Sequence, residues 1–162
     1  MNYFAYGSNM SIARLRERVP RARKIGCCYL ESHKLRFHKL SDDGSGKCNA
    51  LYTGGADRVY GVLYDIMSEE KPALDQVEGL GFGYREASSF VINDRGDRVA
   101  AFFYSAIRID NTVKPYSWYL NHVLVGARAS GLPESYIRKL EQVAMIEDLD
   151  SERESMERAI YK

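Results

Sequence analysis

The order of the apolar patterns along the chain is the feature that most restricts its fold. Seven segments have the pattern of strands, and they cover residues 2–6, 24–30, 34–40, 48–53, 59–66, 84–93 and 98–105. A short helix over 10–18 and a longer one over 68–78 interrupt them, and from Tyr116 onward the spacing becomes helical, with a last helix over 134–145. Strands first and helices last favour an α+β domain with a mixed, curved sheet.

Length and charge limit what the chain can do. It has 162 residues, of which 45% are hydrophobic, and a formal net charge of +1. We expect a single domain over 1–162, with the last fifteen residues or so, which are acidic, as a candidate peripheral tail or short helix. The near-zero charge gives no strong case for nucleic acid or a membrane as partner. No segment approaches the roughly 20 apolar residues that span a bilayer.

The cysteines indicate a reducing environment. Cys27, Cys28 and Cys48 are odd in number and lack the spacing of a disulfide framework, and no signal peptide is visible, so we expect a cytoplasmic protein. His33 and His38 could join them as metal ligands, but no pair has the usual ligand spacing. We therefore expect no metal and no thiol nucleophile, and we expect His38 on a strand surface.

The first strand ends abruptly in small polar residues. Gly7, Ser8 and Asn9 follow the strand over 2–6 directly, and Ser11 is placed to cap the helix after them. A glycine here lets the backbone turn N–H groups inward, and such groups at a helix start can bind a carboxylate or an oxyanion. The alternative is an ordinary strand-to-helix turn.

A second candidate lies at the end of the helix over 68–78. With Ser68 as its cap, Leu74 and Val77 would face the core and Asp75 would face water. Glu78 would then lie on the last turn beside the buried stripe, where burial and the helix dipole both disfavour its charge. A general acid/base is commonly tuned in this way.

Glu78 and the basic residues from Arg14 to Lys24 each have an alternative interpretation. Glu78 could be a structural residue, paired with Arg85 or Arg128. The basic residues from Arg14 to Lys24 could bind nucleic acid, but we expect most of them to be a solvated helix face and loop. This segment also lacks the interleaved aromatic residues that stack on bases.

Eight short motifs follow one another through most of the chain. They are Phe4-Ala5-Tyr6-Gly7-Ser8-Asn9-Met10, Asp43-Gly44-Ser45-Gly46-Lys47, Val59-Tyr60-Gly61-Val62-Leu63-Tyr64, Leu74-Asp75-Gln76-Val77-Glu78-Gly79, Gly83-Tyr84-Arg85, Pro115 with Tyr119, Gly126-Ala127 and Gly131-Leu132-Pro133. In this order they resemble the gamma-glutamylcyclotransferase-like family, which includes plant avirulence-induced proteins and the cyclotransferase of butirosin biosynthesis. The last fifteen residues or so match no motif.

The resemblance implies a small mixed β-barrel with helices packed around it and a pocket at one end. The substrate-binding positions that it carries over are Tyr6, Gly7, Ser8, Asn9 and Tyr119, and the catalytic position is Glu78. The loop would bind a glutamyl group through its backbone N–H groups. Cys48 stands where many relatives have a smaller residue, so that wall of the pocket departs from the pattern.

The resemblance also implies a reaction. A γ-glutamyl amide would cyclise by attack of its own α-amine, releasing 5-oxoproline and a free amine, with Glu78 as general acid/base and no cofactor. The partner would be this small molecule, with no nucleic acid or membrane, and a homodimer is left open. The alternatives are a catalytically silent relative that binds a glutamyl-like ligand or a protein, and a nucleic-acid-binding domain that uses Arg14–Lys24.

Overall fold

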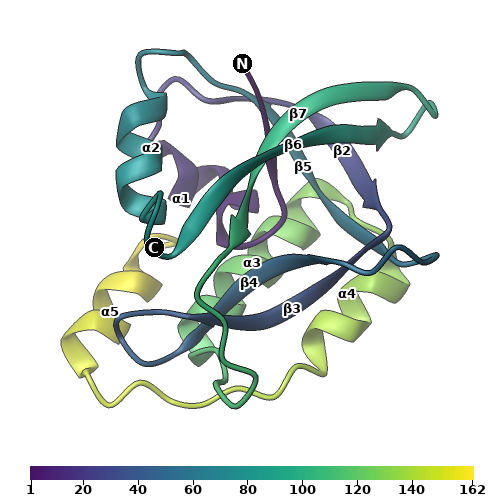
Figure 1. The fold of residues 1–162 in the computed structure, drawn as a ribbon. Coiled ribbons are helices and arrows are strands. Elements are labelled where there is room, and N and C mark those ends of the chain that lie inside the picture. Colours follow the sequence, from purple (N-terminus) through teal and green to yellow (C-terminus); the bar gives the residue numbers. More distant parts are fainter.

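The computed structural model describes residues 1–162 and has the predicted α+β class (Figure 1). Its strands are β1 (Asn2–Ala5), β2 (Arg23–Glu31), β3 (His33–Leu40), β4 (Gly46–Tyr52), β5 (Arg58–Asp65), β6 (Tyr84–Asn93) and β7 (Arg98–Ala106). Its helices are the 3-10 turn η1 (Ser8–Met10), α1 (Ile12–Arg16), α2 (Lys71–Glu78), α3 (Ser117–Ser130), α4 (Glu134–Glu141) and α5 (Ser151–Ala159). No helix is long and apolar enough to cross a membrane.

Five strands close into a barrel in the order β1-β5-β2-β6-β7, which confirms the barrel that the family resemblance implies. β1 pairs antiparallel with β5 and meets β7 in parallel at Tyr3 and Phe102, which completes the closure. β3 and β4 form a separate two-stranded sheet (Figure 1). Gly61 allows β1 and β5 to approach, because a Cβ there would lie 2.4 Å from the Ala5 carbonyl oxygen.

Helix α3 packs against η1 and so supports the loop that follows β1. Gly126 makes this approach possible, since a Cβ at Gly126 would lie 2.5 Å from the backbone of Met10 and Ser11. Ser11 caps α1 as predicted, and its side chain accepts a hydrogen bond from the Arg14 N–H. The position of the loop is therefore set by a helix more than a hundred residues further along the chain.

The acidic C-terminal segment forms α5, which begins at Ser151 and lies beside α3. Glu157 contacts both the Arg14 guanidinium and Nε2 of His122, the latter at 2.8 Å. The hydroxyl of Tyr161 lies 2.6 Å from Nδ1 of His122. The end of the chain thus packs against α1 and α3 through buried polar groups.

Helix α2 differs from the prediction at its start and in the face that it buries. It begins at Lys71 with Glu70 at the N-cap position, whereas Ser68 lies in the preceding turn. Val77 is 53% exposed, so its predicted core position is wrong. Asp75 faces the barrel instead of water, because it pairs with Lys71 and accepts a hydrogen bond from Tyr104.

The surface position predicted for His38 is also wrong. His38 is buried, and its two ring nitrogens contact the side-chain amides of Asn49 and Asn111 at 3.0 and 2.9 Å. Asp110 adds a backbone bond from its N–H to the His38 carbonyl. A loop remote in sequence therefore covers this end of β3.

Candidate active site

The loop after β1 presents backbone donors that no other part of the protein uses. The N–H of Met10 bonds back to the carbonyl of Gly7, which closes the turn. The N–H groups of Gly7, Ser8 and Asn9 donate no hydrogen bond within the protein. Three neighbouring free donors form a concavity that suits an anion or a polarised carbonyl oxygen.

These donors lie beside a small cavity of about 30 Å³. Its lining consists of Tyr3, Tyr6, Gly7, Ser8, Asn9, Cys48, Glu78, Tyr84, Tyr104 and Tyr119. The structure thus brings together all six residues to which the sequence assigns a role, from the segment that follows β1, the end of α2, and α3. Their chemical roles stay predictions.

Glu78, the last residue of α2, is partly buried and directly faces the loop. Its Oε1 accepts a hydrogen bond of 2.7 Å from Nδ2 of Asn9, and the same amide nitrogen donates to the Tyr3 hydroxyl at 3.0 Å. Gly79 ends the helix in the left-handed conformation, with φ 68°. This turn lets the chain leave α2 immediately after the carboxylate.

The structural ion pair considered for Glu78 does not form. Neither Arg85 nor Arg128 contacts its carboxylate, and Arg128 pairs with Glu141 at 2.6 Å. The carboxylate of Glu78 has an amide as its side-chain partner and no cation at salt-bridge distance. It is therefore not neutralised by a fixed partner.

Most of the basic residues from Arg14 to Lys24 are exposed, as predicted, but two of them are not. Arg14 is buried against Glu157, and Arg18 is partly buried and donates to Oδ1 of Asn9. Because a guanidinium can only donate, the Asn9 atom that faces Arg18 must be the oxygen. The amide nitrogen then points toward Glu78, so Arg18 orients the Asn9 side chain.

The other ionisable groups around the cavity are held neutral. Burial raises the pKa of the Tyr3, Tyr6, Tyr84 and Tyr119 hydroxyls. Burial also raises the pKa of the Cys48 thiol to about 12. These groups are poor bases and nucleophiles at neutral pH but can donate hydrogen bonds. Glu78 is the one carboxylate among the lining residues.

Sequence reasoning missed several residues near the cavity. Tyr3, Tyr84 and Tyr104 line it, and the Lys39 ammonium lies 4.9 Å from the centre of the Tyr84 ring. Burial lowers the pKa of Lys39, although the carboxylate of Glu78 acts against this. The abundance of tyrosine, twelve residues, was the available signal, because a curved sheet alone does not require so many.

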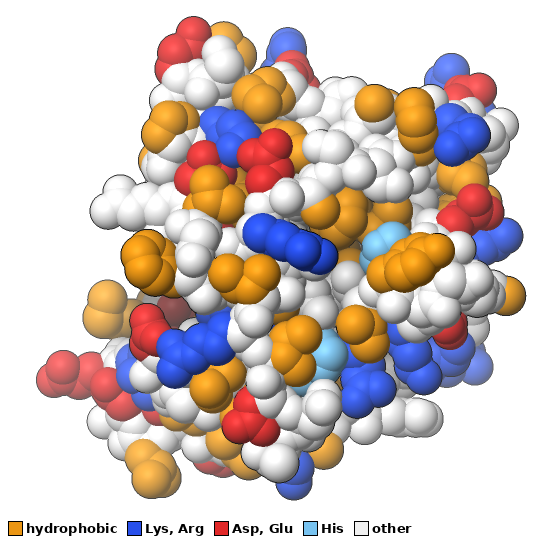
Figure 2. Space-filling model, in the orientation of Figure 1, with side chains coloured by type: hydrophobic (Ala, Val, Ile, Leu, Met, Phe, Trp, Pro, Cys, Tyr) orange, Lys and Arg blue, Asp and Glu red, His pale blue; other side chains and the backbone are white.

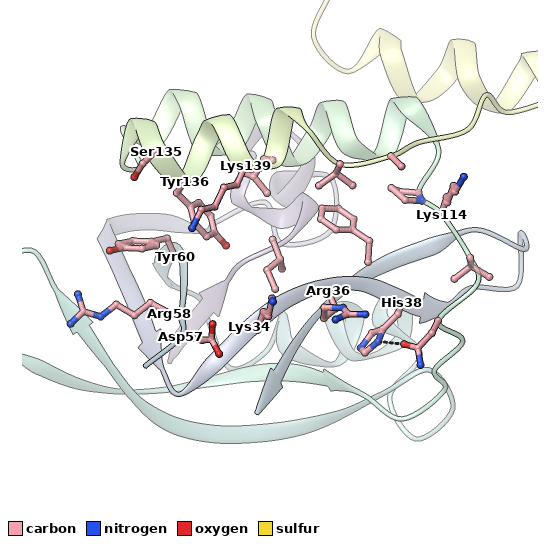
Figure 3. A pocket seen from close by; sticks show the side chains of 18 of the residues that line it. Lys34, Arg36, His38, Asp57, Arg58, Tyr60, Lys114, Ser135, Tyr136 and Lys139 are labelled. Carbon is pink, nitrogen blue, oxygen red and sulfur yellow. Dashed lines mark hydrogen bonds between the residues drawn. The ribbon is translucent and has the colours of Figure 1, made fainter. Parts of the chain in front are cut away.

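A much larger hollow lies elsewhere in the molecule. It has a volume of about 680 Å³ and runs between β3 and α4 (Figure 3). It shares no lining residue with the cavity beside Glu78. Size therefore favours the hollow between β3 and α4, whereas the free backbone donors and the unpaired carboxylate favour the cavity beside Glu78. Chemistry is the better guide to a reaction site, so we assign the candidate active site to the smaller cavity.

Comparison with known proteins identifies similar sequences. Two curated relatives are each named gamma-glutamylcyclotransferase. The one from Bos taurus is 29% identical over 146 residues, which is 87% of this chain and 77% of the relative. The one from Mus musculus is 28% identical over 167 residues, which is 99% of this chain and 87% of the relative.

Solved structures share the fold over nearly the whole chain. A gamma-glutamyl cyclotransferase superposes with a TM-score of 0.88 at 24% identity, covering 98% of both chains. An uncharacterized protein from Homo sapiens superposes with a TM-score of 0.89 at 27% identity, covering 99% of this chain and 98% of the other. The family model described as the AIG2-like family matches residues 58–140, which is about half of the chain. This chain therefore belongs to the AIG2-like family.

Proposed function

We propose that this protein is a gamma-glutamylcyclotransferase, which converts a γ-glutamyl amide into 5-oxoproline and a free amine. The observation that carries the proposal is the placement of the Glu78 carboxylate beside the free N–H groups of Gly7, Ser8 and Asn9. The names of the relatives from Bos taurus and Mus musculus support the same activity.

The nucleophile in this reaction belongs to the substrate. The α-amine nitrogen attacks the γ-carbonyl carbon, the bond from that carbon to the departing nitrogen breaks, and a five-membered lactam forms. Two protons leave the α-ammonium, and the departing group gains two when it leaves as an ammonium ion. The protons lost by the α-ammonium therefore equal those gained by the departing nitrogen, and Glu78 carries them from one nitrogen to the other.

The loop would stabilise the charge that develops during attack. The γ-carbonyl oxygen becomes an oxyanion, and the N–H groups of Gly7 and Ser8 are free to bind it. The neutral hydroxyl of Tyr119, which accepts a 3.0 Å bond from the Cys48 N–H, keeps its own proton available for donation. Holding the α-amine and the γ-carbonyl together would lower the activation free energy by several kcal/mol through orientation alone.

The size of the cavity supports a second candidate, a silent relative that does not turn over substrate. About 30 Å³ holds one water molecule, whereas a glutamyl group is several times larger. An active enzyme must therefore open this cavity when substrate enters. In this proposal the loop that directly follows Glu78 moves to admit substrate; it contains Gly79, Gly81 and Gly83, and its Phe82 is 86% exposed.

The substitution Glu78→Gln tests the proposal. The amide keeps the shape of the side chain but cannot carry protons, so we expect turnover to fall on the order of 10²-fold or more. The assay is 5-oxoproline release from a panel of γ-glutamyl amino acids and amines. Glu69→Gln is the matched control, because Glu69 is exposed shortly before the same helix.

Two results would contradict this assignment. Near-normal release by folded Glu78→Gln would remove Glu78 from the chemistry. No release from any compound, together with binding of a glutamyl analogue by the wild-type protein, would identify the silent relative.

The proposal extends to the surroundings of the enzyme. A small γ-glutamyl compound is its partner, with no requirement for nucleic acid, because Arg14 of the basic segment is occupied by Glu157. The three free cysteines support a reducing, cytoplasmic location. A homodimer is compatible with this activity, and sedimentation of the purified protein would test it.

A further inference from the structure

The large hollow between β3 and α4 is a groove with its own chemistry. Figure 3 shows Lys139 and Tyr136 reaching from α4 toward β3, which carries Lys34 and Arg36 on the opposite side. Phe37 separates the groove from the candidate active site, since its ring packs edge-on against Tyr119 at a centroid distance of 6.5 Å. The groove is therefore a distinct feature and does not depend on the proposed reaction.

Unpaired positive charge dominates the lining. The basic side chains are Lys34, Arg36, Arg58, Lys114 and Lys139. None of them forms a salt bridge, although some exposed arginines elsewhere are paired, as in Arg21–Glu70, Arg23–Asp65 and Arg128–Glu141. Asp57 is the one carboxylate in the groove. Figure 2 shows blue side chains gathered at the lower right of the molecule, although the whole chain carries only +1.

Apolar and aromatic side chains form the rest of the lining. The rings of Tyr60 and Tyr136 lie 5.0 Å apart, and Leu35 and Phe37 are partly buried from β3. The volume of about 680 Å³ falls within the range of ligand sites in proteins. An occupant would thus contact cations along the rim and apolar surface inside.

One edge of β3 has no strand partner along the groove. β3 pairs with β4 on its other side at His33–Arg36 and again at Lys39 and Leu40, with an irregularity between the two stretches. Beyond β4, its backbone bonds occur only near its end, where Leu40 donates to the Arg108 carbonyl and Asp110 donates to the His38 carbonyl. Residues 33–37 therefore leave a free edge of roughly 16 Å, at about 3.3 Å per residue. A free edge is a template for an additional strand.

We propose that this groove binds an extended acidic peptide segment of a partner protein. The peptide backbone pairs with the free edge of β3, its carboxylates face Lys34, Arg36 and Lys139, and alternate apolar side chains contact the Tyr60–Tyr136 pair. Backbone pairing favours a peptide over nucleic acid, because a strand edge offers peptide-spaced N–H and C=O groups. The edge is also too short to track more than about three nucleotides.

Binding of a labelled peptide tests this proposal. The probe is a fluorescein-labelled hexapeptide of alternating Glu and Val, measured by anisotropy in 50 mM and 300 mM salt. We expect saturable binding that weakens at least fivefold at the higher salt. The double variant Arg36→Glu/Lys139→Glu should bind at least tenfold more weakly. Lys24→Glu, an exposed and unpaired position on β2, is the matched control and should change binding less than twofold.

Two altered probes separate charge from backbone pairing. A peptide with Gln in place of Glu should bind at least tenfold more weakly, and so should one with alternate backbone nitrogens methylated. Equal affinity for either altered peptide overturns the proposal. A thymidine oligonucleotide of six residues that binds more tightly than the acidic peptide also overturns it, and assigns the groove to nucleic acid. Thermal unfolding of each variant verifies that the exposed substitutions leave the fold intact.

Discussion

At the scale of single residues, the side-chain amide of Asn9 connects a cation to the proposed catalytic carboxylate. Its oxygen faces Arg18, and its nitrogen donates to Glu78 and Tyr3. An amide can present either end to a neighbour at little cost, so Arg18 selects the orientation that gives Glu78 a donor. Arg18 is thus a positioning residue, which acts on the carboxylate through Asn9.

The substitution Arg18→Gln should disturb this orientation without removing the carboxylate. A glutamine can donate or accept, so the Asn9 amide is no longer held in one orientation. We expect kcat for 5-oxoproline release to fall about tenfold with KM changed less than threefold, and the pH–rate profile to shift because the surroundings of Glu78 change. If activity instead fell only in proportion to the fraction of unfolded protein, with KM and the pH–rate profile unchanged, Arg18 would have a merely structural role.

Arg16→Gln is the matched control for this experiment. Arg16, the last residue of α1, lies two residues before Arg18 but is exposed, and its hydrogen bonds go to the Ala22 carbonyl. We expect its kinetics and pH profile to match those of the wild-type protein. An equal loss in Arg16→Gln would attribute the effect to the net charge of the segment.

At the scale of elements, the loop after β1 is held between α3 and β4. Gly126 allows α3 to contact the backbone at Met10, and Gly7 allows β4 to approach from the other side. A Cβ at Gly7 would lie 3.0 Å from Cβ of Cys48 and 3.3 Å from the Tyr119 hydroxyl. The loop is thus packed tightly on both faces, which fixes its free N–H groups in place.

Gly7→Val and Ser11→Ala should separate the function of the loop from the stability of α1. Valine at Gly7 would displace Cys48 or Tyr119, so we expect affinity for a γ-glutamyl analogue to fall at least tenfold. Alanine at Ser11 removes the cap and should cost about 1 kcal/mol of unfolding free energy with little change in affinity. Calorimetric titration and urea unfolding measure the two effects. Unchanged affinity in Gly7→Val would show that the loop is an ordinary turn.

At the scale of the whole molecule, the C-terminal helix is joined to the first helix by buried charge. Glu157 is held between Arg14 and His122, and all three lie near the base of the loop. Burial would raise the pKa of Glu157, but the hydrogen bond to His122 and the charge of Arg14 outweigh it and lower the pKa to about 2. Burial also lowers the pKa of His122, so this ring is neutral at pH 7.

The depressed pKa of Glu157 makes a prediction about acid stability. A carboxyl whose pKa falls on folding stabilises the protein above its unfolded value of about 4.5, and this contribution is lost as the pH falls toward 2. We expect Glu157→Gln to lower the unfolding free energy by about 2 kcal/mol at pH 7, because it leaves Arg14 without a counter-charge. The difference in unfolding free energy between Glu157→Gln and the wild-type protein should become smaller as the pH falls from 5 to about 3.

Urea unfolding at several pH values checks this prediction. Glu152→Gln is the control, since Glu152 is exposed and forms no salt bridge, and it should differ little from the wild type at any pH. A difference for Glu157→Gln that stayed constant from pH 7 to pH 3 would rule out the charged pair as its cause.

Much of the local structure could be predicted from short stretches of sequence. The strand alternation, the Ser11 cap, the stop at Gly79 and the hairpin of β6 and β7 all depend on residues within a few positions of one another. The residues that meet at the candidate site were named from motifs, although those motifs lie about seventy residues apart. The local elements can be predicted because backbone preference and side-chain periodicity act over one or two turns, whereas the site residues were taken from the resemblance of these motifs to a family.

Which side chains are buried was decided by partners distant in the sequence. Asp75 faces the barrel because the Tyr104 hydroxyl of β7 donates to it, and Arg14 is buried because Glu157 arrives from the far end of the chain. Periodicity cannot foresee such pairs, since a charge can leave water only where the fold supplies its counter-charge. The same holds for the groove: Lys34, Arg36 and Lys139 are ordinary surface cations in the sequence, and only the placement of α4 opposite β3 brings them to one groove.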